Sequence, residues 1–354
     1  MIYIAFLGII TIKIEVDIMK SVILNVGSSS IKFKIFNNRD EIFAGLIESI
    51  DSFEDAFDNM KNQIIDSGIR DIDRVGHRVV HGGDIFNQPT LITDKVISQI
   101  ESISHLAPLH NPLNLIGIRL ALKIYPNIPH FAIFDTAFHN TIPNYAYRYA
   151  IDNKYYRDDK IRKYGFHGIS CSYITREVSK NYNNPNIIAI HLGNGASITA
   201  IRGGKSIDTS MGFTPLDGLV MGSRSGGLDP AIITFIMDRY NLTSNKINII
   251  LNKESGLKGL CGLSDMREIL DSDSLESRLA IDIFCYRIQK YIGAYIAVIG
   301  KVDTIVFTGG IGENSKLIRD KILDGLEHIT KDIDILVIKA NEELEMVLDI
   351  ISKK

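Results

Sequence analysis

The sequence predicts an α/β protein built from two similar halves. Segments typical of strands and of helices alternate through both halves, which is the pattern of the α/β class. A strand followed by a tight, glycine-containing turn occurs three times, at residues 21–36, 186–201 and 304–315. The length of 354 residues favours two domains of ordinary size over one.

The first two of these segments predict β-hairpins, and the third predicts a strand, a glycine turn and a helix from Ser315 onwards. In residues 21–36 the second strand alternates apolar and polar side chains, and in residues 186–201 the pair Asn194-Gly195 is a strong hairpin signal. Such turns direct backbone N–H groups toward one point and suit an anionic phosphate. Two halves that each offer such a turn indicate a duplicated fold that closes on a nucleotide in a cleft.

Two helices are clear from the sequence. Asn111 is a typical cap residue and Pro112 a typical first helical residue, and an apolar face follows them through Ile124. Residues 275–299 are apolar around most of the helical circumference, which predicts a core helix. Residues 140–152, with Pro143 and several tyrosines, are a plausible crossing between domains.

Composition excludes several classes of protein. A net charge of −3 without a run of lysine or arginine gives no sign of a positively charged surface that would bind nucleic acid. Three cysteines lie far apart without a CxxC pair, which argues against disulfides or a zinc site and favours a reducing cytoplasm. The apolar run at residues 1–12 is too short to span a membrane and lacks the basic start of a signal peptide. We expect residues 1–19 to be a non-structural extension, with translation starting at Met19.

Nine of the 28 glycines fall between His191 and Pro230, which indicates close approach of backbone to a ligand. The known nucleotide loops do not explain this window. Lys205-Ser206 resembles the end of a P-loop, but the first glycine of that motif would fall on Thr199. The GxGxxG spacing also fails here and at residues 310–315.

Eight motifs occur in an order that resembles the acetate kinases of the acetokinase family, within the actin-like ATPase superfamily. They are LNVGSSSIK (24–32), GHRVVHGG (76–83), LAPLHNP (106–112), FDTAFH (134–139), YGFHGIS (164–170), HLGNG (191–195), MGSRSG (221–226) and GIGEN (310–314). The resemblance implies a duplicated actin-like (ribonuclease H-like) fold with two domains around a nucleotide cleft. Domain I would comprise residues 20–136 and 344–354, domain II would comprise residues 139–343, and two chains would form a homodimer.

The same resemblance implies reversible transfer of the ATP γ-phosphoryl group to acetate, giving acetyl phosphate and ADP. A carboxylate is already ionised at pH 7 and needs no general base, so catalysis should rest on positioning and on cations. Arg78 would grip the substrate carboxylate and Arg224 the phosphoryl group. His167 would stabilise the transition state, and Asp135 would orient the metal-bound phosphates or the basic groups.

The remaining site residues are also implied by the resemblance. Mg²⁺, for which Mn²⁺ could substitute, would be held by Asn25 and Glu342, although Glu342 and Glu343 could equally be charges at a helix N-terminus. A closed apolar pocket for the methyl group of acetate would be formed by Val80, Leu109, Phe166 and Pro215. ATP would contact Lys32, His191, Leu192, Gly193, Asn194, Gly195, Asp265, Met266, Arg267, Gly310, Ile311, Gly312, Glu313 and Asn314.

Three alternatives stay open. A propionate or butyrate kinase of the same family differs by a few methylenes in the pocket, each worth roughly 1–3 kcal/mol. A sugar or polyol kinase of the superfamily would have little need for Arg78. An ATP-driven switch without a small-molecule product would have no carboxylate to bind. The chain also departs from the family pattern, because Val26 stands where a small residue is common and residues 38–74 and 314–341 are short.

Overall fold

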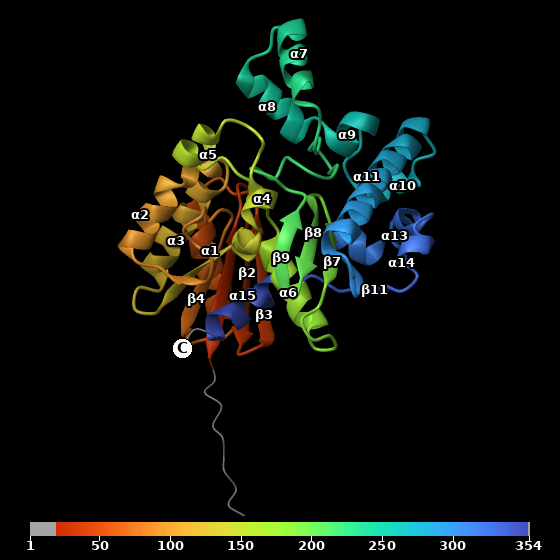
Figure 1. The fold of residues 1–354 in the computed structure, drawn as a ribbon. Coiled ribbons are helices and arrows are strands. Elements are labelled where there is room, and N and C mark those ends of the chain that lie inside the picture. Colours follow the sequence, from red (N-terminus) through yellow and green to blue (C-terminus); the bar gives the residue numbers. More distant parts are fainter. Residues whose placement is uncertain (1–18, 353–354) are drawn as a thin grey trace, which may run out of the picture.

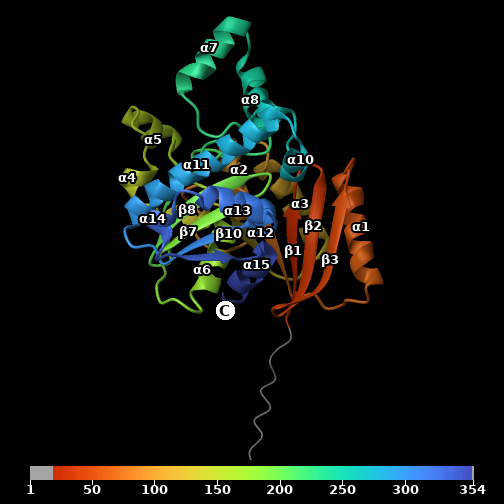
Figure 2. The same ribbon diagram turned by 90° about the vertical axis from the view of Figure 1, so that its right-hand side faces the viewer.

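The computed structural model describes residues 19–352, so the expected extension over residues 1–19 lies outside this range except for Met19. Two mixed sheets form the centre of the molecule (Figures 1 and 2). The first has the order β3-β2-β1-β4-β6-β5, with β1 (Lys20–Val26), β2 (Ser30–Asn37), β3 (Asp40–Glu48), β4 (Arg74–Val79), β5 (Thr90–Leu91) and β6 (His130–Phe134). The second has the order β11-β10-β7-β8-β9, with β7 (Ile187–Leu192), β8 (Ala196–Arg202), β9 (Lys205–Thr209), β10 (Thr304–Thr308) and β11 (Asp334–Val337).

The two sheets repeat one topology. In the first sheet, β1, β2 and β3 form an antiparallel meander, and β4 and β6 continue parallel to β1. In the second sheet, β7, β8 and β9 form the same meander, and β10 and β11 continue parallel to β7. The predicted α/β class and its internal duplication are therefore confirmed.

Side-chain alternation places helices on both faces of each sheet. In the first sheet, Val22 and Leu24 face α1 (Phe53–Asp66) and α3 (Asn111–Ile124), while Ile23 faces α15 (Glu342–Ile351). The second sheet packs on α11 (Leu275–Ile299) and on α6 (Gly168–Val178). The last helix of the chain, α15, packs on β1, β2 and β4 and therefore lies beside the first sheet (Figure 2). It also packs on α6.

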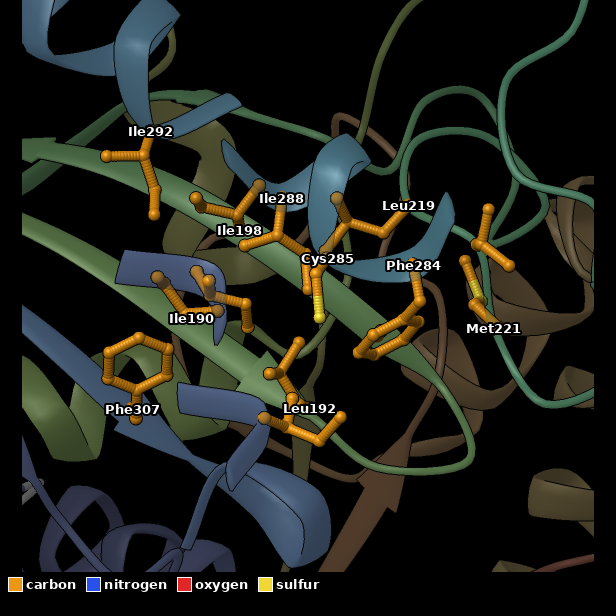
Figure 3. Packing of buried hydrophobic residues seen from close by; sticks show 14 of the residues in the cluster. Ile190, Leu192, Ile198, Leu219, Met221, Phe284, Cys285, Ile288, Ile292 and Phe307 are labelled. Carbon is orange, nitrogen blue, oxygen red and sulfur yellow. The ribbon is translucent and has the colours of Figure 1, made fainter. Parts of the chain in front are cut away.

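The larger core lies between α11 and the second sheet. Figure 3 shows Phe284, Cys285, Ile288 and Ile292 of α11 against Ile190, Leu192 and Ile198 of β7 and β8. The remaining helices are α2 (Asp94–Ser102), η1 (Ser104–Leu106), η2 (Ala137–Thr141), α4 (Asn144–Tyr147), α5 (Asn153–Asp159), α7 (Pro230–Tyr240), α8 (Ser244–Lys253), α9 (Gly256–Cys261), α10 (Met266–Asp271), α12 (Gly309–Asn314), α13 (Lys316–Leu323) and α14 (Glu327–Thr330). None of the helices within residues 19–352 is both long and apolar enough to cross a membrane.

Both predicted hairpins are present, and the core helix over residues 275–299 has the predicted bounds. Two local predictions were wrong. The N-cap of α3 is His110, because the buried side chain of Asn111 bonds the backbone of His81 and leaves the helix end uncapped. The glycines after β10 form the short helix α12 in place of an open turn, and Ser315 caps the next helix, α13.

Candidate active site

Three predicted site residues lie at the carboxyl ends of neighbouring parallel strands. Asn25 is near the end of β1, Arg78 is near the end of β4, and Asp135 directly follows β6. Since β1, β4 and β6 are adjacent and parallel, their carboxyl ends share one edge of the sheet. This edge is where α/β sheets generally bind ligands.

Arg78 is the centre of this group. Its Nη2 donates to Oδ2 of Asp135 at 2.5 Å and its Nη1 donates to Oδ1 of Asn25 at 3.3 Å. Burial alone would lower the pKa of Arg78, but the carboxylates of Asp135 and Glu342 raise it, so the guanidinium stays charged. Nε of Arg78 and Oδ1 of Asp135 are buried and have no hydrogen-bond partner. A donor and an acceptor therefore remain available for a ligand at this point.

The adjacent glutamates at the start of α15 have different surroundings. Glu343 is bound by Nζ of Lys32 at 2.7 Å and lies 3.6 Å from Nζ of Lys34. Glu342 has no such lysine pair, and its pKa is raised to about 7, first by burial and then by Asp135 and Glu343, against the opposing effect of Arg78. Glu342 is thus the carboxylate that gains most from an added cation. Lys32, which is predicted to contact ATP, forms its ion pair with Glu343 while its own side chain stays half exposed.

These oxygen ligands fit Mg²⁺, which prefers a few carboxylate or amide oxygens together with water and phosphate. Asn25 and Lys32 are directly paired across the first hairpin, so their side chains share one face beside Glu343. Within residues 19–352, no cluster of three or more His, Cys, Asp or Glu side chains is arranged to hold a metal by itself. A cation here would therefore need oxygen atoms of a bound phosphate as well.

His167 is held in an unusual backbone conformation at the start of α6. It has φ 57°, in the left-handed region, and Gly168 N donates to Asp135 O at 2.8 Å. Its Nδ1 lies 3.0 Å from Oγ of Ser197, and its ring stacks on His191 with centroids 4.2 Å apart. Burial, followed by His191 and the two arginines, lowers the pKa of His167 well below 6.5. At neutral pH this side chain is an uncharged imidazole.

Gly195 brings His167 and Arg224 together. A Cβ atom added at Gly195 would lie 3.4 Å from Nε2 of His167 and 3.8 Å from Nη1 of Arg224. The loop that carries Arg224 packs directly on this turn, because Gly222 N donates to the carbonyl of Asn194 at 3.1 Å. Burial lowers the pKa of Arg224, and no carboxylate within the described part of the chain forms an ion pair with it. Its charge is therefore free to meet an anion.

A pocket of about 640 Å³ opens beside the same turn, and its volume is within the usual range for a small-molecule site. It is lined by eight predicted residues, Gly193, Asn194, Asp265, Met266, Arg267, Gly310, Ile311 and Asn314, together with Ser264, Leu270 and Ser315, which sequence reasoning missed. Ser264 and Ser315 directly adjoin predicted motifs, and Leu270 lies one helical turn after Met266, a spacing that could have indicated it.

Six other predicted nucleotide residues do not line this pocket: Lys32, His191, Leu192, Gly195, Gly312 and Glu313. The side chain of Leu192 packs in the core. Nδ1 of His191 lies 2.9 Å from Oγ of Ser170. The carboxylate of Glu313 turns inward and accepts from Gly309 N at 2.9 Å and Ala340 N at 2.8 Å. The side chain of Glu313 therefore holds the backbone at Gly309 and at Ala340 in place.

The four predicted acetate-pocket residues are unevenly buried. Val80 and Phe166 are buried, Pro215 is half-buried, and Leu109 is 61% exposed. Leu109 precedes α3 on the surface, and the closed pocket that these four side chains are expected to form stays a prediction. The pKa of His110, the next residue, is lowered by burial and then by the charges of Arg224 and Arg78.

Three further histidines, His77, His130 and His139, are buried and hydrogen-bonded. Nε2 of His77 lies 2.9 Å from Nδ1 of His130. His139 contacts Oγ of Ser206 through Nδ1, and its Nε2 lies 2.9 Å from the carbonyl of Phe166. His139 thereby supports the backbone at one wall of the acetate pocket.

Comparison with known proteins agrees with this arrangement. The model of the acetokinase family matches residues 51–353. A curated acetate kinase from Sulfurovum sp. is 44% identical over 93% of this chain and 97% of its own length. A solved propionate kinase from Francisella tularensis superposes with TM-score 0.90 at 39% identity, covering 94% of this chain and 98% of its own. Porphyromonas gingivalis acetate kinase gives TM-score 0.89 at 35% identity, covering 94% of this chain and 99% of its own. The chain belongs to the acetokinase family.

Proposed function

We propose that this chain transfers the γ-phosphoryl group of ATP to acetate, reversibly, giving acetyl phosphate and ADP. One observation carries the proposal: Gly193 and Asn194 line a nucleotide-sized pocket, and Gly195, the next residue of the same turn, lies beside Arg224 and His167. A phosphate chain that crosses this turn from the pocket would bring its terminal group to an unpaired guanidinium and a neutral imidazole. Curated relatives of this chain carry the name acetate kinase.

The reaction is an in-line displacement. One carboxylate oxygen of acetate forms a bond to the γ-phosphorus, and the bond from that phosphorus to the β–γ bridging oxygen breaks, releasing ADP. Arg78 binds the acetate carboxylate through its free Nε–H, and Arg224 neutralises charge on the transferring oxygens. His167 contributes a hydrogen bond as an uncharged donor, with Nδ1 directed to Ser197. Asp135 keeps Arg78 in place through its Oδ2, and its Oδ1 accepts no hydrogen bond from the described residues.

Asn25 and Glu342 would hold Mg²⁺, or Mn²⁺ in its place, beside the phosphates. The metal would screen the negative charge that otherwise keeps acetate and ATP apart. The raised pKa of Glu342 supports its assignment over Glu343, because Glu343 is already neutralised by Lys32.

The protein acts in the cytoplasm as a homodimer, and its chain divides into domain I (20–136 with 344–354) and domain II (139–343). An exposed apolar surface supports the dimer. Helix α7 has no buried residue and projects with α8 away from both sheets (Figure 1). Ile232, Phe235 and Tyr240 on α7 are exposed, as are Leu275 and Leu279 on α11. A second copy would remove this apolar area from water.

The test is an ATP assay with hydroxylamine trapping of the acyl phosphate, comparing the unmodified chain with Arg224→Ala and Arg119→Ala. Arg119 is a half-exposed arginine on α3 and serves as the control. We expect Arg224→Ala to lower kcat by about 10²–10³-fold and Arg119→Ala to leave it unchanged. Equal product from all three proteins, or none from the unmodified chain, would overturn the proposal.

The second candidate is a propionate kinase, because Leu109, one of the four predicted pocket residues, is 61% exposed and so does not by itself limit the length of the acid. Comparing kcat/KM for acetate, propionate and butyrate separates these activities, and we expect acetate to be preferred. Butyrate preferred over acetate would reject the proposal. Phosphorylation of alcohols would indicate a sugar or polyol kinase, and ATP hydrolysis without a phosphorylated product would indicate a switch.

A further inference from the structure

The segment Val80–Gly83, which follows β4, is held in place by side chains. The sheet ladder ends at Val79, so the backbone N–H groups of this segment need other partners. Val80 N donates to Oδ1 of Asn114 at 3.1 Å, His81 N to Oδ1 of Asn111 at 3.0 Å, Gly82 N to Oγ1 of Thr136 at 3.0 Å and Gly83 N to Nδ1 of His81 at 3.0 Å. The position of Val80, a wall of the acetate pocket, therefore depends on buried side chains of α3.

Asn114 makes a second hydrogen bond that leads elsewhere. Its Nδ2 donates to the carbonyl of Val26 at 3.0 Å, across 88 positions of the sequence. Val26 directly follows Asn25 at the end of β1, just before the first hairpin turn. Helix α3 packs closely on this end of β1, since a Cβ atom on Gly117 would lie 2.7 Å from Cγ2 of Val26. One buried amide thus links the end of β1, which carries Asn25, to the segment that carries Val80.

Asn111 offers an internal comparison one helical turn earlier. It is also buried and also makes two hydrogen bonds through its side-chain amide, with His81 N at 3.0 Å and His81 O at 2.9 Å. Both of its bonds go to one residue of the 80–83 segment. Asn111 therefore holds only the Val80–Gly83 segment, whereas Asn114 holds both this segment and the end of β1.

We propose that Asn114 is a positioning residue. It fixes the end of β1, which carries the proposed metal ligand Asn25, relative to Val80, the proposed wall of the acetate pocket. This inference rests on the proposed function, since it assigns Asn25 to the metal and Val80 to acetate. Loss of the Asn114 amide releases Val26 and Val80 together, and each is left with an unpaired buried backbone group. Binding of nucleotide and binding of acetate should then weaken together, although Asn114 touches neither ligand.

The test compares Asn114→Leu with Asn111→Leu, which remove the same amide from the same helix at nearly constant volume. The measurements are KM for acetate, kcat, and the affinity for ADP with Mg²⁺ by calorimetry in the absence of acetate. We expect Asn114→Leu to raise KM for acetate and to weaken ADP binding by about tenfold each. Asn111→Leu should raise KM for acetate and leave ADP affinity unchanged.

A third variant, Asn114→Asp, separates the two bonds and serves if the leucine variant does not fold. Its carboxylate still accepts from Val80 N but no longer donates to Val26 O. We expect it to weaken ADP binding while KM for acetate stays near that of the unmodified chain. ADP affinity unchanged in both Asn114 variants, or weakened equally by Asn111→Leu, overturns the inference. An unmodified chain that binds ADP but makes no acetyl phosphate would refute the proposed function alone, because the calorimetry still tests the link.

Discussion

Buried neutral histidines predict that mild acid destabilises this protein. His81 and His139 are fully buried. Burial lowers the pKa of His81 to about 3, an effect reinforced by His105 and Arg162. Burial likewise lowers the pKa of His139 to about 4, against the opposing hydrogen bond to Phe166 O. Both side chains therefore stay uncharged in the folded protein at pH values where an unfolded chain is protonated.

The magnitude follows from proton linkage. An unfolded histidine has a pKa of about 6.5, so below pH 6.5 the unfolded state binds a proton that the folded state does not. Stability contributed by such a group is present above pH 6.5 and is lost, as the pH falls, by about 1.4 kcal/mol per unit. Lowering the pH from 7.5 to 5.5 should thus cost about 3 kcal/mol through His81 and His139 together. His77 and His167 act in the same direction, and Glu342, whose pKa is raised to about 7, acts in the opposite direction.

The assay is urea unfolding of the whole protein at pH 7.5 and 5.5, without ligands, for the unmodified chain and for His139→Gln. The quantity compared is the change in unfolding free energy between the two pH values, so a general loss of stability in the variant cancels. We expect His139→Gln to reduce that change by about 1.4 kcal/mol. His328→Gln, at an exposed histidine of α14, is the control and should match the unmodified chain. Identical pH dependence in all three proteins would refute the reasoning.

Three further predictions concern the site and the surface. Gly195→Ala would place a methyl group 3.4 Å from Nε2 of His167, and we expect kcat to fall by about 100-fold while ADP affinity, by calorimetry, is retained; equal loss of both would contradict this. Glu342→Gln should raise the Mg²⁺ concentration needed for half-maximal activity far more than Glu343→Gln does, because only Glu342 lacks a lysine partner; equal shifts in a Mg²⁺ titration would count against it. Phe235→Asp adds a charge to the exposed face of α7 and should shift sedimentation from dimer to monomer, whereas an unchanged dimer would exclude that surface.

Local sequence signals were sufficient to predict the elements whose structure depends mainly on residues close to one another in the chain. The Asn194-Gly195 turn needs only its own residues, and the apolar period of residues 275–299 determines a helix before any packing is considered. The order of eight motifs was enough to infer the family and to assign its site positions to Arg78, Arg224 and His167. Local rules failed at Asn111, where a cap residue instead bonds His81, thirty positions earlier in the chain.

The sequence by itself determined the fold class, the duplicated hairpins and the residue types of the site. Only the tertiary structure decided their electrostatic states, since these depend on neighbours from distant segments. Glu342 and Glu343 are adjacent and chemically identical, yet Lys32 from the first hairpin neutralises one and burial beside Asp135 raises the pKa of the other. A pKa and a buried hydrogen bond arise from three-dimensional surroundings, and long-range contacts between the two ends of the chain supply those surroundings.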